Sequence, residues 1–127
     1  MWRKKLEVCG EARDRETWIY TLSGNLFGSA EGYAFQEETR ERIRSGIKKM
    51  VVDLAAVDRI DSSGVGILVA TMWSASQAGA GLALASVTPK VERVLSIAML
   101  LEHIEHADSV DAALAKLDEM KLDVPAP

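Results

Sequence analysis

Two adjacent serine hydroxyls stand where the sequence predicts the start of a helix, and such hydroxyls can accept a phosphoryl group. The apolar run from Val65 to Trp73 predicts a buried helix, and Asp61-Ser62-Ser63-Gly64 comes directly before it. A helix N-terminus offers unpaired backbone N–H groups and the positive end of the helix dipole. A phosphate on a serine there would find donors, so its attachment need not unfold the domain. The competing interpretation is a structural cap, because Asp and Ser are favoured at that position.

Two glycines, Gly64 and Gly66, weaken the first turn of this helix by about 1 kcal/mol each in helix propensity. Burial of apolar side chains offsets that cost, since each large one contributes roughly 1.5–3 kcal/mol. The apolar face comprises Val65, Leu68, Val69 and Met72. We expect both glycines to keep the surface beside the serines low, so that another protein can approach it closely.

Other residue types that support catalysis or metal binding lack the necessary neighbours. His103 and His106 are the only histidines, and their acidic segment has neither zincin spacing nor an obvious third ligand. We interpret that segment as a solvated connection. Cys9, the single cysteine, has no base indicated near it and fits a small buried residue. The sequence also contains no phosphate-binding loop, dinucleotide fingerprint or hydrolase elbow. We therefore predict neither a catalytic centre nor a metal site.

The composition predicts one globular domain spanning residues 1–127. The chain is 48% hydrophobic and 27% charged, which are ordinary values for a folded protein. Its formal net charge of −4 argues against a protein that binds the phosphate backbone of nucleic acids. A lone cysteine fits a reducing cytosol. The apolar run at 65–73 is far shorter than the roughly 20 residues that span a bilayer. We expect a cytoplasmic protein without a membrane partner.

The first half of the chain predicts a hairpin followed by a surface helix. Alternating apolar residues from Leu6 to Leu22 indicate two strands joined at Asp14-Arg15-Glu16, the second ending at Ser23-Gly24-Asn25. Apolar positions then recur every four residues from about 29 to 45, which indicates an amphipathic helix. An ion pair between Glu38 and Arg42 would support it.

The second half predicts alternating buried strands and helices. Met50–Val57 and Leu82–Val87 suit strands covered on both faces, and the helix between them should end near Gly79 or Gly81. Strand, helix and strand in this order imply a right-handed parallel crossover. Thr88-Pro89 begins a third helix, and a last one starts near residue 108 or 109. The predicted fold class is α/β, with a mixed four- to five-stranded sheet and about four helices. Its core covers about residues 6–118, and the tail at 123–127 should be frayed.

With these features the chain resembles the STAS domain family, particularly the bacterial anti-sigma factor antagonists. Asp61-Ser62-Ser63-Gly64 matches the family's Asp-Ser-Ser/Thr-Gly motif, which follows a hydrophobic strand. Leu22-Ser23-Gly24-Asn25-Leu26 resembles the family's strand end and Gly-x-Leu turn, and Thr88-Pro89 resembles its Ser/Thr-Pro helix start. The resemblance covers about residues 6–118 and implies a single STAS-like domain.

The resemblance also implies a function, which is that of a phosphorylation-switched binding protein and not of an enzyme. Ser62 takes the place of the family's phosphoacceptor. The unmodified domain would bind an anti-sigma factor that is a serine kinase with a GHKL-type ATP site, and so free a sigma factor. Phosphorylation would release that partner, and a metal-dependent serine phosphatase would reverse the mark. No cofactor is expected on the domain itself. The expected partner-binding residues are Gly24, Asn25, Phe27, Asp61, Ser63, Gly64 and Val65.

Two departures from the family leave alternatives open. Phe27 stands where many relatives have an aspartate, and Ala98-Met99-Leu100 replaces a common Ser/Thr-Gly-Leu ending of the third helix. Phe27 is either a partner contact or a loop aromatic folded onto the core. The rival functions are a constitutive STAS scaffold in a sensory or transporter assembly, with Ser62 only a cap, and a small enzyme using His103 and His106. The oligomeric state stays open, with a monomer compatible.

Overall fold

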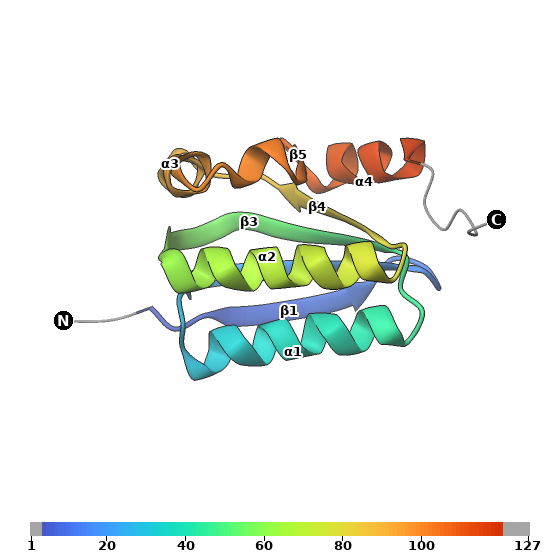
Figure 1. Cartoon of the computed structure of the whole chain (residues 1–127), viewed down its shortest axis with the longest axis horizontal. Coiled ribbons are helices and arrows are strands. Elements are labelled where there is room, and N and C mark those ends of the chain that lie inside the picture. The colour runs from blue at the N-terminus through green and yellow to red at the C-terminus, as the bar shows by residue number, and fades with distance from the viewer. Residues whose placement is uncertain (1–3, 121–127) are drawn as a thin grey trace.

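Five strands form one sheet in the computed structural model, which describes residues 4–120 (Figure 1). The strands are β1 (Glu7–Ala12), β2 (Thr17–Leu26), β3 (Lys49–Ile60), β4 (Gly81–Ala85) and β5 (Glu105–Ala107), and they lie side by side in that order. β1 pairs antiparallel with β2, whereas the later pairs are parallel. The mixed sheet confirms the predicted fold class. The expected frayed tail lies outside the described residues.

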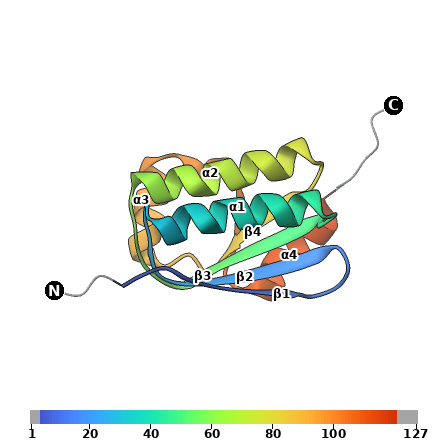
Figure 2. The same cartoon turned by 90° about the horizontal axis from the view of Figure 1, so that it is seen from below.

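Helices cover both faces of this sheet. Within residues 4–120 the α-helices are α1 (Ala30–Arg44), α2 (Ser62–Gln77), α3 (Pro89–Ile97) and α4 (Val110–Glu119), with a 3₁₀ turn, η1, at Leu100–Glu102. α1 and α2 lie side by side on one face, and α4 lies on the other (Figure 2). α3 packs against β3. Each parallel strand pair is joined through a helix that returns the chain to the same edge of the sheet.

Two apolar clusters hold the layers together. The larger one lies between the sheet and the α1–α2 layer and includes Tyr20, Phe35 and Leu68, none more than 1% exposed. The smaller one lies under α4 and includes Val51 and Leu117. All residues of β4 are buried, as expected for a parallel strand covered on both faces.

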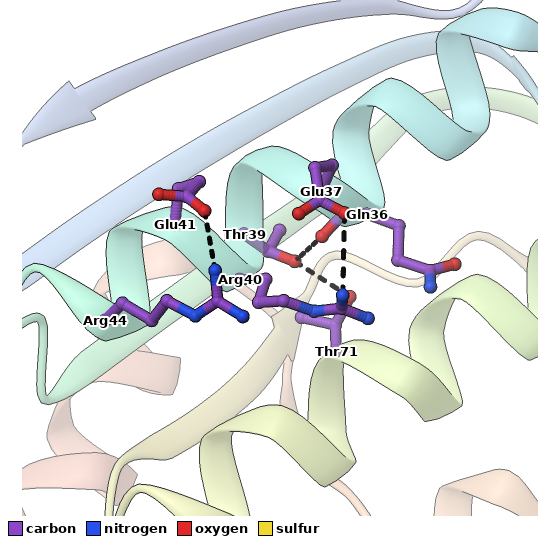
Figure 3. Close-up of polar contacts among 7 residues, drawn as sticks. All are labelled: Gln36, Glu37, Thr39, Arg40, Glu41, Arg44 and Thr71. Carbon is purple, nitrogen blue, oxygen red and sulfur yellow. Dashed lines mark hydrogen bonds and ion pairs between the residues drawn. The ribbon is translucent and has the colours of Figure 1, made fainter.

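Polar contacts on α1 differ from the predicted pair. The structure pairs Arg40 with Glu37 at 3.6 Å and Arg44 with Glu41 at 2.9 Å (Figure 3). Arg42 instead places its guanidinium 3.8 Å from the centre of the Trp18 ring. The predicted Glu38–Arg42 ion pair is therefore wrong, because stacking on the indole holds Arg42.

The α1–α2 contact includes two buried threonines. The hydroxyl oxygens of Thr39 and Thr71 lie 3.3 Å apart (Figure 3). Each hydroxyl also donates within its own helix, Thr39 to the carbonyl of Gln36 at 2.7 Å and Thr71 to that of Ile67 at 2.9 Å. A hydroxyl has one proton to donate, so this pair adds shape complementarity between the helices more than a hydrogen bond.

Three sequence-based expectations about the elements are corrected. β2 does not end at Ser23-Gly24-Asn25 but continues to Leu26, with register irregularities between Thr21 and Ser23 and between Gly24 and Asn25. The segment expected to be a solvated connection contains β5, an edge strand with an exposed Glu105, which pairs with β4. Short edge strands tolerate charged residues, so its composition hid it. Cys9, expected to be buried, is exposed on β1.

Candidate functional site

The chain turns from β3 into α2 at Asp61, which caps the helix. Its carboxylate oxygen Oδ1 accepts a hydrogen bond from the backbone N–H of Gly64 at 2.8 Å. Ser62 is the first helical residue, its side chain is exposed, and its hydroxyl has no hydrogen bond within residues 4–120. The predicted helix cap is therefore confirmed at Asp61, and Ser62 is not the capping residue. The Ser62 hydroxyl stands at a helix N-terminus and faces solvent.

Gly64 serves packing inside the domain. It is buried, and a Cβ atom built on it would collide with the carbonyl oxygen of Leu26 and lie 2.7 Å from Cγ1 of Ile60. The absent side chain therefore lets the start of α2 approach the ends of β2 and β3. Gly64 therefore has a role inside the domain, and its contact with a partner stays a prediction. Gly66 is different, because it is exposed and a Cβ atom there would meet nothing within 4 Å.

Gly24 and Asn25 also lie inside the molecule. Gly24 has a left-handed φ of 88°, and a Cβ atom on it would collide with the carbonyl oxygen of Lys5. The backbone N–H of Asn25 donates to the carbonyl of Lys4 at 3.2 Å, and the residue is only 9% exposed. The segment before β1 covers both residues, and their contact with a partner stays a prediction.

The remaining expected partner residues surround Ser62 at the surface. Ser63 and Val65 are half-buried on the first turn of α2. A Cβ atom on Gly28 would lie 2.8 Å from Oγ of Ser63 and 3.1 Å from the hydroxyl of Tyr33, so the loop before α1 passes close to Ser63. Tyr33 is 53% exposed. No sequence pattern indicated Tyr33, because its place beside α2 depends on the packing of α1.

Phe27 is half-buried and opens onto a groove, which we call the α3 groove. Its lining residues are Phe27, Arg59, Ile60, Asp61, Lys90 and Val94, and it encloses about 410 Å³. Phe27 follows β2, Asp61 follows β3, and Lys90 lies in the first turn of the helix after β4. Carboxyl ends of parallel strands meet at one edge of a sheet, and ligands commonly bind there. Phe27 is thus accessible, and it is not a core aromatic.

Some charged side chains around the α3 groove form ion pairs and others do not. Lys90 lies 3.5 Å from a carboxylate oxygen of Asp58, with side-chain exposures of 65% and 38%. The side chain of Arg59 is exposed and has no ion pair or hydrogen bond within residues 4–120. Asp61 turns Oδ1 toward its own helix. Sequence reasoning missed Arg59, Lys90 and Val94, since α3 reaches this site only through the crossover after β4.

Other sequence candidates lie elsewhere. Among the described residues, no group of three or more His, Cys, Asp or Glu side chains is placed to hold a metal ion. His103 lines a separate hollow near the end of α2, together with Trp73 and Met120. In the part of the chain that the structure describes, no helix has the length and apolar character needed to cross a membrane.

Comparisons with known proteins agree with the geometry. The family model described as the STAS domain matches residues 11–113. Two curated relatives, each assigned as an anti-sigma factor antagonist, come from Thermotoga neapolitana and Thermotoga maritima. They are 35% and 34% identical to this chain over 77 residues, which is 61% of this chain and 68% of each relative.

The solved structures of SpoIIAA, an anti-sigma factor antagonist, share the fold. The unphosphorylated form matches with a TM-score of 0.76 at 19% identity, over 90% of this chain and 98% of that one. The phosphorylated form, from Bacillus, matches with a TM-score of 0.62 at 20% identity, over 87% and 98%. At these identities the likeness concerns the fold alone.

Proposed function

Because the chain belongs to the STAS domain family, we propose that it is an anti-sigma factor antagonist whose binding is switched by phosphorylation of Ser62. The observation that carries the proposal is the hydroxyl of Ser62, which is exposed on the first turn of α2 and takes no part in capping the helix. In this role the domain is a binding protein of the cytoplasm and not an enzyme. Its relatives in sequence are assigned as anti-sigma factor antagonists, and SpoIIAA is known in unphosphorylated and phosphorylated forms.

The partner in this proposal is an anti-sigma factor with a GHKL-type serine kinase site. The unmodified domain binds it through the surface around Ser62, Ser63 and Phe27, and a sigma factor is freed. The kinase transfers the γ-phosphoryl group of ATP to Oγ of Ser62, which gives up its proton, and ADP leaves. A metal-dependent serine phosphatase hydrolyses the phosphoester and restores the serine.

Charge explains why phosphorylation would release the partner. A phosphate adds about −1.5 to −2 charges at pH 7, next to Asp61 and near Asp58. The first-turn N–H groups of α2 can donate to it, so the domain itself accommodates the group. A docked partner would have to remove water from the added charge, or it would be repelled by it. A coupling free energy of about 1–3 kcal/mol suffices for a 5- to 150-fold change in affinity.

Phosphorylation by the cognate kinase tests this proposal. With ATP and Mg²⁺ we expect one added phosphate, mapped to Ser62 by mass spectrometry of the intact protein and of its peptides. Ser62→Ala should block the modification, and Ser76→Ala, which changes an exposed serine near the other end of α2, is the matched control that should keep it. Phosphate mapped only to Ser63, or retained in Ser62→Ala, would contradict the assignment. Partner binding without any modification of Ser62 would favour the constitutive scaffold.

A further inference from the structure

The loop between β2 and α1 is held against the first turn of α1. Ser29 caps this helix, because its hydroxyl accepts a hydrogen bond from the backbone N–H of Gly32 at 3.1 Å. Gly32 is buried, and a Cβ atom on it would collide with the carbonyl oxygen of Phe27 and lie 3.0 Å from Cδ1 of Ile67. The start of α1 therefore packs directly against the loop and beside α2 (Figure 2). Such close packing leaves the loop little freedom to move.

Gly28, in this loop, lies against the side chain of Ser63. A Cβ atom on Gly28 would come within 2.6 Å of Cβ and 2.8 Å of Oγ of Ser63, and within 3.1 Å of the hydroxyl of Tyr33. The φ of Gly28 is not left-handed, so this position uses the small size of glycine and not its backbone freedom. The loop and the phenol of Tyr33 thus meet at the Ser63 side chain.

The neighbouring serine has no such cover. Ser62 is exposed, whereas Ser63 is half-buried. Successive residues of a helix point about 100° apart, so one hydroxyl can face solvent while the next faces the loop. Phosphoryl transfer requires the acceptor oxygen in line with the γ-phosphorus of ATP and the leaving oxygen, so the acceptor has to be reachable by the active site of the kinase.

From this difference we infer that Gly28 and Tyr33 restrict covalent modification at the start of α2 to Ser62. They enclose the side chain of Ser63 and leave that of Ser62 open. Both are specificity-determining residues, because they act on the alternative acceptor and not on the reacting atoms. The inference rests on the proposed function for the kinase reaction, whereas the cover over Ser63 is a property of the folded domain.

Thiol probes test this cover without a kinase. Cys9 is exposed and is first removed by Cys9→Ser, and a single cysteine is then introduced by Ser62→Cys or Ser63→Cys. An aromatic disulfide reagent releases one coloured thiolate for each cysteine that it modifies. We expect the Ser62→Cys protein to react roughly tenfold faster than the Ser63→Cys protein, because thiol–disulfide exchange needs access to the sulfur.

Substitutions at Tyr33 supply the matched variants. Tyr33→Ala should speed the reaction of the Ser63→Cys thiol about fivefold and leave that of the Ser62→Cys thiol unchanged, since only the former gains access. Comparison of each thiol with itself removes any difference in thiol pKa between the two positions. Tyr33→Phe keeps the ring and should have the smaller effect. Trp73→Ala, which removes another exposed aromatic from the second half of α2, should change neither rate. Circular dichroism of each variant shows whether it is folded.

The kinase reaction shows whether the same cover selects the phosphoacceptor. Where the kinase modifies Ser62, the Ser62→Ala protein should carry no phosphate. The Ser62→Ala, Tyr33→Ala double variant should gain phosphate on Ser63, located by mass spectrometry of its peptides. A substitution that only altered stability would not move the phosphate from one serine to the next.

The outcomes separate this inference from the proposed function. Equal reactivity of the two thiols, or equal effects of Tyr33→Ala and Trp73→Ala, would overturn the inference even if the kinase modifies Ser62. So would the absence of phosphate on Ser63 of the double variant in a kinase reaction that modifies Ser62. If no phosphate reaches Ser62 while the thiols differ as expected, the proposed function fails and the restriction of modification to Ser62 stands.

Discussion

At the scale of single residues, the two glycines of the first turn of α2 show that surroundings decide what a glycine contributes. Both have the same low helix propensity. Gly64 is enclosed by the backbone of Leu26 and the side chain of Ile60, whereas Gly66 faces open space. One glycine is needed for the packing of α2 on the strand ends, and the other keeps the surface beside Ser62 bare.

Alanine substitutions at these glycines should change stability in opposite directions. Gly64→Ala places a methyl group against a backbone carbonyl that cannot move aside cheaply, and we expect a loss of about 1–3 kcal/mol in the free energy of unfolding. Gly66→Ala should gain up to about 1 kcal/mol from helix propensity. Urea denaturation of both variants measures the difference. Stabilisation by both would show that α2 is not held against Leu26 as described.

The motif also shows which features of the candidate site a residue pattern can predict. Asp61-Ser62-Ser63-Gly64 located the helix start and the accessible hydroxyl, because capping preferences are local. The residue types of the motif did not distinguish the capping Asp61 from Ser62, whose hydroxyl is unpaired. Nor did the sequence indicate that Gly64, Gly24 and Asn25 are buried. Those facts depend on which distant backbone covers each residue, namely Leu26 for Gly64 and Lys4–Lys5 for the other two.

At the scale of elements, the end of α3 carries a strained residue. Met99 follows α3 with a left-handed φ of 59° and is 58% exposed. The family's common Ser/Thr-Gly-Leu ending would place a glycine there, and glycine adopts this conformation without steric cost. The structure thus accounts for the departure at Ala98-Met99-Leu100, because the chain keeps the turn and accepts the strain of a larger side chain.

Met99→Gly should therefore stabilise the domain. Relief of left-handed strain is worth about 1–2 kcal/mol, and the greater freedom of glycine in the unfolded chain removes about 0.5–1 kcal/mol of it. We expect a net gain of about 0.5–1 kcal/mol in the free energy of unfolding by urea titration. Met99→Ala is the control, since it keeps the strain and should change stability little. A loss in Met99→Gly would mean that the exposed side chain makes a stabilising contact.

The types of the longer helices and strands were largely predictable from the sequence, whereas the ends of these elements and the short strand β5 were not. Apolar periodicity located α1, and nearly continuous apolar runs located α2 and the buried strands β3 and β4, because the arrangement of apolar residues reflects which faces are covered. β5 was missed, since three residues at a sheet edge carry no period and keep their charges in solvent. The α3 groove was missed as a site for a different reason, because it exists only where three separate segments meet, namely Phe27, residues 59–61 and α3.

At the scale of the whole molecule, the proposed binding surface and the main core lie in different places. The ends of β2 and β3 and the starts of α2 and α3 build the surface around Ser62. Tyr20, with no exposed surface, lies in the main core against Phe35, with ring centres 5.1 Å apart. A change in the core should therefore alter unfolding without altering recognition.

Alkaline unfolding tests this separation through Tyr20. Burial, with nearby Glu38 adding to it, raises the pKa of Tyr20 well above its usual value of 10.0. A raised pKa in the folded state means that the associated stability is complete below pH 10 and falls as the pH rises above it. The expected loss is about 1.4 kcal/mol per pH unit. Lys49, whose pKa is raised by Asp118 at 2.6 Å, adds a smaller loss of the same sign above its usual 10.5.

Tyr20→Phe should flatten this alkaline loss without abolishing it, because the Lys49–Asp118 pair still titrates. The free energy of unfolding by urea, measured at intervals from neutral pH to beyond pH 10, gives both slopes. Phosphorylation of Ser62, measured at neutral pH, should match the wild type, since the substitution lies inside the core and leaves the strand ends unchanged. Equal alkaline slopes in the two proteins would show that Tyr20 ionises as readily folded as unfolded. A drop in phosphorylation would show that the core and the surface around Ser62 are coupled.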